Sequence, residues 1–258
     1  MDYGIGMLSV APMRAETSDR AEIVTQLLFG ECYEVVAQEG NWRCLQLATD
    51  GYRGWIDFKL HTPVSEEYYK AWCQTKHSRS LDLLQTVQQG EVQIPIGIGS
   101  YLPFFDGQHI RVNEERLAIT GTVVAPDATQ TPDELIAVAH RFLKFPYLWG
   151  GKSVFGIDCS GFTQQVFGIC GYQLPRDAYQ QALHGEEVHF VTQAQPGDLA
   201  FFSNPEGRIT HVGIVLEGQQ IMHAHGEVRV DKLDHNGIYN ANLKRYTHNL
   251  RIIKRISF

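Results

Sequence analysis

The chain has 258 residues, of which 43% are hydrophobic, and a formal net charge of -7. This length suits one large domain or two to three small ones, with ample apolar material for a core. The negative charge and the lack of a long run of Lys and Arg argue against a nucleic-acid or anionic-membrane surface. No window approaches the ~18 uninterrupted apolar residues that a membrane span needs, so we expect none.

The compartment is predicted from the N-terminus and the cysteines. Residues 1–5 lack a cationic stretch followed by an apolar run, so they do not read as a secretory signal. The five cysteines contain no CxxC pair, which predicts neither a disulfide framework nor a zinc site. At least one thiol is unpaired within the monomer, which fits a reducing compartment. We expect a cytoplasmic protein; the alternative is a periplasmic or exported protein whose signal was removed.

Short apolar runs separated by turn signals predict an all-β N-terminal part. The first small barrel is expected over residues 1–65, with strands at residues 33–36, 42–47 and 52–56. Ser65 can cap a helix over residues 65–75, whose first turn is acidic. The short-strand pattern returns from about residue 80, so we expect a linker helix and a second small barrel over residues 66–125.

The pattern changes after the boundary at residues 125–128. Thr131 and Glu134 predict a capping box that starts a helix. Further helices are expected over residues 159–171 and after Pro175, and strands over residues 199–202, 210–216, 220–224 and 250–256. Helices first and strands after predict an α+β domain over residues 126–258.

Cys159 is the candidate nucleophile. A cysteine is more often a small buried hydrophobe, but this one begins a predicted helix between Asp158 and Ser160. The amides and dipole of a helix N-terminus favour a thiolate, and the same amides can stabilise an oxyanion. Cys170 lies at the opposite end of that helix, where the dipole has the wrong sign, so we interpret it as structural.

His211 and His223 are the candidate bases among eleven histidines. They lie on two strand-like runs joined by residues 216–218. A three-residue hairpin loop ending at glycine would place His211 directly opposite His223, where one imidazole can orient the other. The alternative is a pair of half-buried histidines, and an even-length loop would put them on opposite faces. Most others, such as His61, His77 and His248, are expected to be solvated.

A metal site is the competing interpretation. His223 and His225 would share a strand face, and Asp198 and Glu227 are nearby in the sequence. Zinc takes three or four ligands, and the chain has neither an HExxH motif nor a cysteine pair. We therefore expect neither a metal nor another cofactor.

With these residues assembled, residues 126–258 resemble the NlpC-type cell-wall peptidase family. The matching stretches, in the order of the family, are residues 147–151, 156–161, 174–177, 195–199, 209–214 and 222–224. The resemblance implies a papain-like α+β fold with Cys159 as nucleophile, His211 as general base and then acid, and His223 as orienting residue. It also implies that the Tyr147 hydroxyl lies near the oxyanion; ordinary aromatic packing is its alternative role.

The N-terminal half is similar to one branch of that family, which carries two bacterial SH3-like barrels. The matching positions are residues 20–26, Gly30, Trp42, residues 50–52 and residues 54–55. In that branch the first barrel closes the substrate cleft, and an acidic residue and a tyrosine bind the substrate's free N-terminus. Their counterparts here are Glu22 and Tyr52. A carboxylate facing an ammonium group is a sound specificity device, because a longer chain would clash and leave it unpaired. The alternative for Glu22 is a solvated surface charge.

The resemblance implies further substrate-binding residues. They are Trp149, Asp158, Ser160, Arg176 and Asp177. Some relatives place a serine after the Arg-Asp pair, whereas this chain has Ala178, which offers no side-chain hydrogen bond.

The implied activity is that of a cysteine peptidase that cuts the bond between γ-D-Glu and an L-diamino acid in murein peptides. The diamino acid is L-Lys or meso-diaminopimelate, the substrate has a free N-terminal L-Ala, and the product is L-Ala-γ-D-Glu. A free N-terminus indicates recycling of cell-wall peptides. The alternatives are a thiol amidase or acyltransferase on the same fold and a wall-binding protein with a vestigial peptidase. The intact Cys159, His211 and His223 argue against the last.

Overall fold

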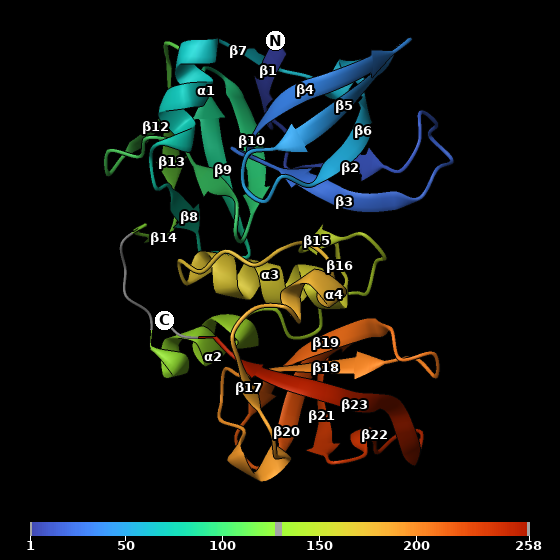
Figure 1. Cartoon of the computed structure of the whole chain (residues 1–258). Coiled ribbons are helices and arrows are strands. Elements are labelled where there is room, and N and C mark those ends of the chain that lie inside the picture. The colour runs from blue at the N-terminus through green and yellow to red at the C-terminus, as the bar shows by residue number, and fades with distance from the viewer. Residues whose placement is uncertain (1, 127–130, 257–258) are drawn as a thin grey trace. The chain divides into compact units, whose positions relative to one another are not determined.

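The structure is a computed structural model that describes residues 2–126 and 131–256 (Figure 1). The chain forms two compact units. Unit 1 consists of Met1–Ala128 and Trp149–Val154, and unit 2 of Thr129–Leu148 and Phe155–Phe258. A short segment between two parts of unit 2 therefore belongs to unit 1. Within the described residues, every helix is too short or too polar to cross a membrane.

Unit 1 is built from short strands and one α-helix. Its first sheet has the strand order β3-β2-β6-β5-β4-β1-β7, and two smaller sheets have the orders β10-β9-β13-β12 and β11-β8-β14. The strands of the first sheet are β1 (Asp2–Ile5), β2 (Val10–Arg14), β3 (Ile23–Leu28), β4 (Cys32–Glu39), β5 (Trp42–Leu47), β6 (Arg53–Asp57) and β7 (Pro63–Val64). The other strands are β8 (Ser78–Ser80), β9 (Leu84–Gln89), β10 (Val92–Gly97), β11 (Tyr101–Leu102), β12 (His109–Val112), β13 (Glu115–Thr120), β14 (Val123–Val124) and β15 (Lys152–Ser153).

The predicted helix after Ser65 is confirmed as α1 (Glu66–Cys73). The Ser65 hydroxyl accepts a hydrogen bond from the backbone N–H of Tyr68 at 3.0 Å. Buried residues from both predicted barrels, such as Phe29 and Val87, belong to one apolar cluster that also includes the buried face of α1. Unit 1 is therefore held together by a core that both parts share.

Apart from the two-residue strand β16 (Gly156–Ile157), the helices of unit 2 come before its strands, in the order that the sequence predicts. The helices are α2 (Pro132–His140), α3 (Cys159–Ile169) and α4 (Ala178–Gln181). The capping box forms at the start of α2: the Thr131 N–H donates to Glu134 Oε2 at 2.7 Å, and the Glu134 N–H donates to Thr131 Oγ1 at 3.3 Å. The strands are β16 (Gly156–Ile157), β17 (Glu186–Val188), β18 (Leu199–Ser203), β19 (Ile209–Leu216), β20 (Gln220–His225), β21 (Glu227–Asp234), β22 (Gly237–Asn240) and β23 (Arg245–Arg255).

Six strands of unit 2 close into a barrel. The sheet order is β17-β23-β18-β19-β20-β21-β22, and β23 also pairs with β22. Alternate residues of each strand face the interior, which is filled by an apolar cluster that includes Phe202, Val215, Ile221 and Leu233. Helix α3 packs against β19 and β20, and α4 packs against β19 (Figure 1). The sequence did not predict β21 and β22, and it placed the start of β23 five residues too late.

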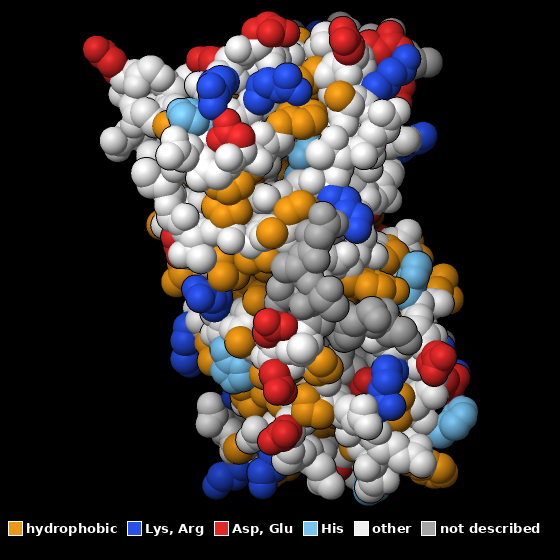
Figure 2. Space-filling model, turned by 90° about the vertical axis from the view of Figure 1, so that its left-hand side faces the viewer, with side chains coloured by type: hydrophobic (Ala, Val, Ile, Leu, Met, Phe, Trp, Pro, Cys, Tyr) orange, Lys and Arg blue, Asp and Glu red, His pale blue; other side chains and the backbone are white. Residues whose placement is uncertain are grey.

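Charge is dispersed over one face of the protein. On the face shown in Figure 2, the described Lys and Arg side chains lie singly or in small groups among Asp, Glu and uncharged residues. Among the described residues of this face, the basic side chains form no continuous patch of the kind that binds nucleic acid. All five cysteines have free thiols, which agrees with the predicted lack of a disulfide framework.

Candidate active site

Cys159 is the first residue of α3, as predicted. Asp158 is the N-cap, and its Oδ1 accepts a hydrogen bond from the backbone N–H of Gly161 at 2.7 Å. The Cys159 side chain is buried, and its thiol receives a hydrogen bond from the backbone N–H of Val212. Val212 follows His211 on β19, so the structure brings the predicted nucleophile to the strand that carries the predicted base.

The thiol is neutral in the resting protein. Burial, followed by the negative charge of Asp158, raises the pKa of Cys159 to about 12. Hydrogen bonds from the backbone N–H groups of Val212 and Ser160 and the positive charge of Arg176 lower the pKa, but they do not outweigh burial. The helix start thus lowers the thiol pKa as expected, but desolvation of the thiolate is the larger effect, so the net pKa is raised.

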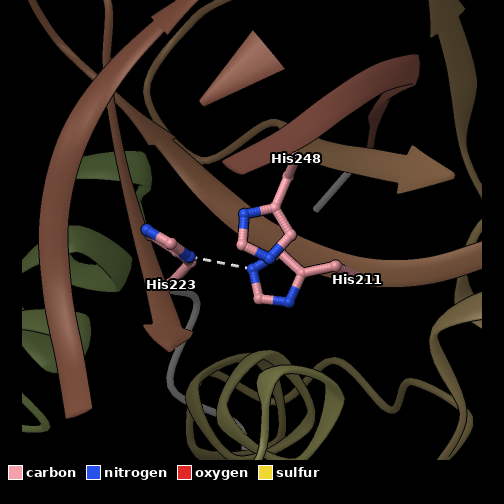
Figure 3. A group of neighbouring side chains, drawn as sticks. All are labelled: His211, His223 and His248. Carbon is pink, nitrogen blue, oxygen red and sulfur yellow. Dashed lines mark hydrogen bonds between the residues drawn. The ribbon is translucent and has the colours of Figure 1, made fainter. Parts of the chain in front are cut away.

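His211 and His223 share one face of the barrel. The β19–β20 register pairs Gly213 with His223, so His211 is a diagonal neighbour of His223 and not its direct partner as predicted. The loop lies one residue further along the chain than the predicted loop over residues 216–218, because Leu216 pairs with Gln220, and φ is positive at both Gly218 and Gln219. A register offset of two keeps both side chains on the same face, and His211 Nε2 lies 2.8 Å from His223 Nδ1 (Figure 3).

The hydrogen-bond chain continues to Asp231 on β21, which the sequence analysis missed. His223 Nε2 lies 3.1 Å from Asp231 Oδ2, and Arg229 donates to both carboxylate oxygens at 2.8 and 3.0 Å. Burial alone would raise the pKa of Asp231, but the hydrogen bonds from His223 and Arg229 outweigh it and the pKa is lowered. The sequence could have revealed this residue. If a tight turn is assumed at Gly226, as one was assumed for the preceding hairpin, the strand register places Asp231 near His223.

This chain determines the tautomers of both imidazoles. Burial is the main cause that lowers the pKa of His211 and of His223, so both rings are neutral at pH 7. An ionised Asp231 can only accept, so His223 carries its proton on Nε2 and accepts at Nδ1. His211 must then donate from Nε2, which leaves its Nδ1 as a lone pair. A neutral imidazole with a free lone pair is a general base.

His248 lies beside this pair. Its ring stacks on that of His211, with centroids 4.0 Å apart and planes 21° apart (Figure 3). Its Nδ1 is 2.9 Å from the Thr247 hydroxyl, and burial lowers its pKa to about 3. The expectation that His248 is solvated is therefore wrong. It is also wrong for His77, because burial lowers the pKa of that residue to about 4.

The geometry does not favour the metal interpretation. The ligand atoms of His211, His223 and His248 lie within 4.8 Å of one another. However, the His211 and His223 nitrogens face each other across a hydrogen bond, and the near-parallel stacking of His211 and His248 keeps their lone pairs from converging on one point. Of the acidic residues considered above, Asp198 is paired with Arg255 at 2.8 Å and Glu227 with Lys144 at 2.7 Å.

Three predicted substrate-binding residues form a buried network at the start of α3. The buried Arg176 donates to both carboxylate oxygens of Asp158, at 3.0 and 2.6 Å, and to the Ser160 hydroxyl at 2.9 Å. Asp177 is the N-cap of α4, and the buried Ala178 is its first residue. The network holds the helix start that carries the thiol in one conformation.

Tyr147 forms a β-bridge with Ile157, two residues before Cys159. Its backbone N–H donates to the Gly226 carbonyl at 2.9 Å. Burial and then the negative charges of Cys159 and Asp158 raise the pKa of Tyr147 to about 12. Its phenol is therefore protonated at neutral pH.

The other predicted residues, Glu22, Tyr52 and Trp149, belong to unit 1. The exposed Trp149 donates a hydrogen bond from Nε1 to Glu22 Oε1, so Glu22 has a defined partner. Tyr52 packs against the apolar cluster of the first sheet. Gly150, with φ of +74°, lies so close to β3 that a Cβ there would be 2.0 Å from the Ile23 carbonyl oxygen.

Comparison with known proteins identifies the class of protein. Residues 144–247 match the NlpC/P60 family, and residues 13–58 match the bacterial dipeptidyl-peptidase Sh3 domain. The chain is 31% identical over 220 residues to the γ-D-glutamyl-L-lysine dipeptidyl-peptidase of Bacillus subtilis strain 168, covering 78% of this chain and 72% of that protein. A Bacillus cereus protein of the same name is 27% identical over 236 residues, covering 79% and 67%.

The fold is shared with a solved structure. The crystal structure of an NlpC/P60 family protein from Bacillus cereus has a TM-score of 0.81, is 20% identical and covers 99% of both chains. The protein is thus a hydrolase, a peptidase of the cysteine type. It belongs to the NlpC/P60 family, with an SH3-like all-β region before the catalytic domain.

Proposed function

We propose that the protein hydrolyses the bond between γ-D-Glu and an L-diamino acid in murein peptides, with Cys159 as nucleophile and His211 as base. The observation that carries this proposal is the hydrogen-bond chain from Asp231 through His223 to His211. The chain leaves Nδ1 of His211 as the only acceptor of that ring, and His211 directly precedes the residue whose N–H binds the thiol.

The proposed reaction starts from a neutral thiol and a neutral imidazole. As sulfur attacks the carbonyl carbon, the thiol proton passes to His211, and the charge that develops there is stabilised through His223 and Asp231. The backbone N–H groups at the start of α3 and the protonated Tyr147 hydroxyl donate to the oxyanion. His211 then protonates the leaving amine, and in the second half it activates water to hydrolyse the thioester.

We further propose that the substrate has a free N-terminal L-Ala whose ammonium group pairs with Glu22, with Tyr52 as its second contact. The name that both Bacillus relatives carry, γ-D-glutamyl-L-lysine dipeptidyl-peptidase, supports this substrate class. Trp149 orients the Glu22 carboxylate through one of its oxygens. We assign a substrate-binding role to Asp158, Ser160, Arg176 and Asp177 as well. The diamino acid is L-Lys or meso-diaminopimelate, and the released product is L-Ala-γ-D-Glu.

The same family resemblance supports proposals for the domain architecture and the cellular compartment of the protein. We propose that residues 66–125 form a second SH3-like barrel and that residues 126–258 form a papain-like α+β domain. A requirement for a free N-terminus restricts the enzyme to peptides already cut from the glycan. We therefore propose a role in recycling cell-wall peptides, in the cytoplasm.

Mass spectrometry of the products tests substrate and mechanism together. We expect release of L-Ala-γ-D-Glu from the free tripeptides with L-Lys and meso-diaminopimelate, and strongly reduced cleavage of the same peptides after N-acetylation. Equal cleavage of the acetylated peptides would refute the role of Glu22 and Tyr52. EDTA should have no effect, and loss of activity with EDTA would revive the metal interpretation.

Two cysteine variants test the nucleophile. Cys159→Ser should lose several orders of magnitude in kcat, because a serine hydroxyl is a much weaker nucleophile than a thiol at neutral pH. The matched control is Cys170→Ser, at the other end of the same helix and also buried, which should keep kcat per folded molecule. Near-normal turnover by Cys159→Ser would contradict the mechanism.

A further inference from the structure

His248 is the side chain at this site that the proposed reaction does not use. It comes from β23, whereas His211 comes from β19, and β18 lies between these strands in the barrel. Phe202 of β18 lies next to both rings, with centroids 5.8 Å from His211 and 6.0 Å from His248. The curvature of the closed barrel therefore brings the two histidine rings into direct contact although their strands are not neighbours.

His223 and His248 restrain the His211 ring in different ways. The hydrogen bond to His223 lies along the edge of the ring and fixes the position of Nε2, but a ring held at one edge can still tilt about that bond. His248 covers a face of the ring at 4.0 Å, which removes this freedom. The Thr247 hydroxyl, 2.9 Å from His248 Nδ1, holds the covering ring in place.

Burial keeps the His248 ring neutral, and the neighbouring His223 and His225 add to this effect. The groups that face it are the rings of His211, His223 and His225 and the carboxylate of Asp231, which is itself paired with Arg229. A second positive charge stacked on His211 would oppose proton transfer from the thiol. A neutral ring instead presents its π face to the imidazolium that forms during the reaction, which is a favourable arrangement.

We propose that His248 is a positioning residue for the general base: its neutral, stacked ring holds the imidazole of His211 in the plane that aims Nδ1 at the reacting thiol and shields that ring from water. This inference rests on the proposed function, in which His211 is the base. It goes further than that function, because it requires residue 248 to present a flat, uncharged ring face to His211, whereas the ring nitrogens of His248 are not required.

Two substitutions separate the effect of the His248 ring face from the effect of its ring nitrogens. His248→Phe keeps a flat ring, and His248→Ala removes it. In steady-state assays with the free tripeptide, His248→Ala should lower kcat by ~10-fold, a part of the ~10²–10⁴-fold that a positioned base contributes, with KM within about twofold. His248→Phe should retain kcat within about threefold. The control is His189→Ala, an exposed histidine of unit 2, which should match the unaltered protein.

The acid limb of the pH profile of kcat/KM also tests the proposal, because it would not shift if His248 only stabilised the fold. Water that replaces the ring in His248→Ala relieves the burial of His211, so its pKa should rise and the acid limb of kcat/KM should shift to higher pH. In His248→Phe the acid limb should stay in place. Rates are normalised to the folded fraction measured by circular dichroism, so unfolding of one variant does not affect the comparison.

The possible outcomes are distinct. An unchanged kcat and acid limb in His248→Ala would overturn the proposal, and so would an equal loss in His248→Phe and His248→Ala. Rescue by Phe together with the acid-limb shift in Ala would support it. His211→Ala is assayed in parallel: if that variant remains active, the proposed function itself fails, whereas an inactive His211→Ala with a normal His248→Ala refutes only the positioning role.

Discussion

The buried ion pair between Lys152 and Glu31 gives a quantitative test of how unit 1 holds the segment Trp149–Val154. Lys152 Nζ lies 2.8 Å from Glu31 Oε1, and each side chain is 2% exposed. Glu31 Oε2 also accepts a hydrogen bond from the Leu28 N–H at 2.7 Å, and the Lys152 N–H donates to Gln26 Oε1 at 2.8 Å. This segment includes Trp149, so the pair anchors the residue that orients Glu22.

We predict that Lys152→Met lowers the free energy of unfolding of unit 1 by about 3–5 kcal/mol, because it leaves the Glu31 carboxylate buried without a counter-charge. The double variant with Glu31→Gln removes both charges and keeps an acceptor for the Leu28 N–H. We expect it to recover most of that loss, since a buried pair replaced as a whole by neutral groups is often close to neutral in stability. Lys70→Met is the control, because its partner Glu66 lies at a similar 2.7 Å but both side chains are exposed, so little change is expected.

The assay is equilibrium urea unfolding followed by tryptophan fluorescence. All four tryptophans of the chain, at positions 42, 55, 72 and 149, belong to unit 1, so the signal reports that unit selectively. A loss below about 1 kcal/mol in Lys152→Met, the range of an exposed pair, would refute the reasoning. A double variant no more stable than the single one would refute the explanation by an unpaired charge.

Three further predictions concern the site and its support. Asp231→Asn can donate to His223 Nε2 and so favours the wrong tautomer; kcat should fall by ~10²–10⁴-fold, and a fall below twofold would contradict the assigned chain. Because protonation removes the base and the pKa of His211 is well below 6.5, the acid limb of kcat/KM should lie under pH ~6. The substrate's own amino group loses its charge near pH ~8 and lowers kcat/KM there, so the thiol is tested by kcat at saturating substrate. With a Cys159 pKa of about 12, kcat should show no alkaline limb up to pH ~10, and a limb near pH ~8.5 would instead indicate a thiolate–imidazolium pair. Gly150→Ala places a Cβ against the Ile23 carbonyl at positive φ and should destabilise unit 1 by about 1–3 kcal/mol or more in the urea assay, and an unchanged midpoint would show that the segment can move away.

Short-range features were predictable from the sequence. The capping box of Thr131 and Glu134 and the cap of Ser65 involve hydrogen bonds over three residues, so the residues that make them are visible in the sequence. The same holds for Cys159, whose place at a helix start depends on its neighbour Asp158 as N-cap. It was also predictable that His211 and His223 share a face. Side chains alternate between the two faces along each strand, so the face depends only on whether the hairpin loop has an odd or an even number of residues.

Only the tertiary structure decided the rest of the site. The residue at which each hairpin closes sets the register, and this made His211 a diagonal neighbour of His223 and brought Asp231 within reach. Closure of the barrel, through pairing of β23 with β22, placed His248 on a ring more than thirty positions away in sequence. Burial reversed the expected pKa shift of Cys159, because desolvation depends on every element packed around the thiol, whereas the helix start that favours the thiolate is local.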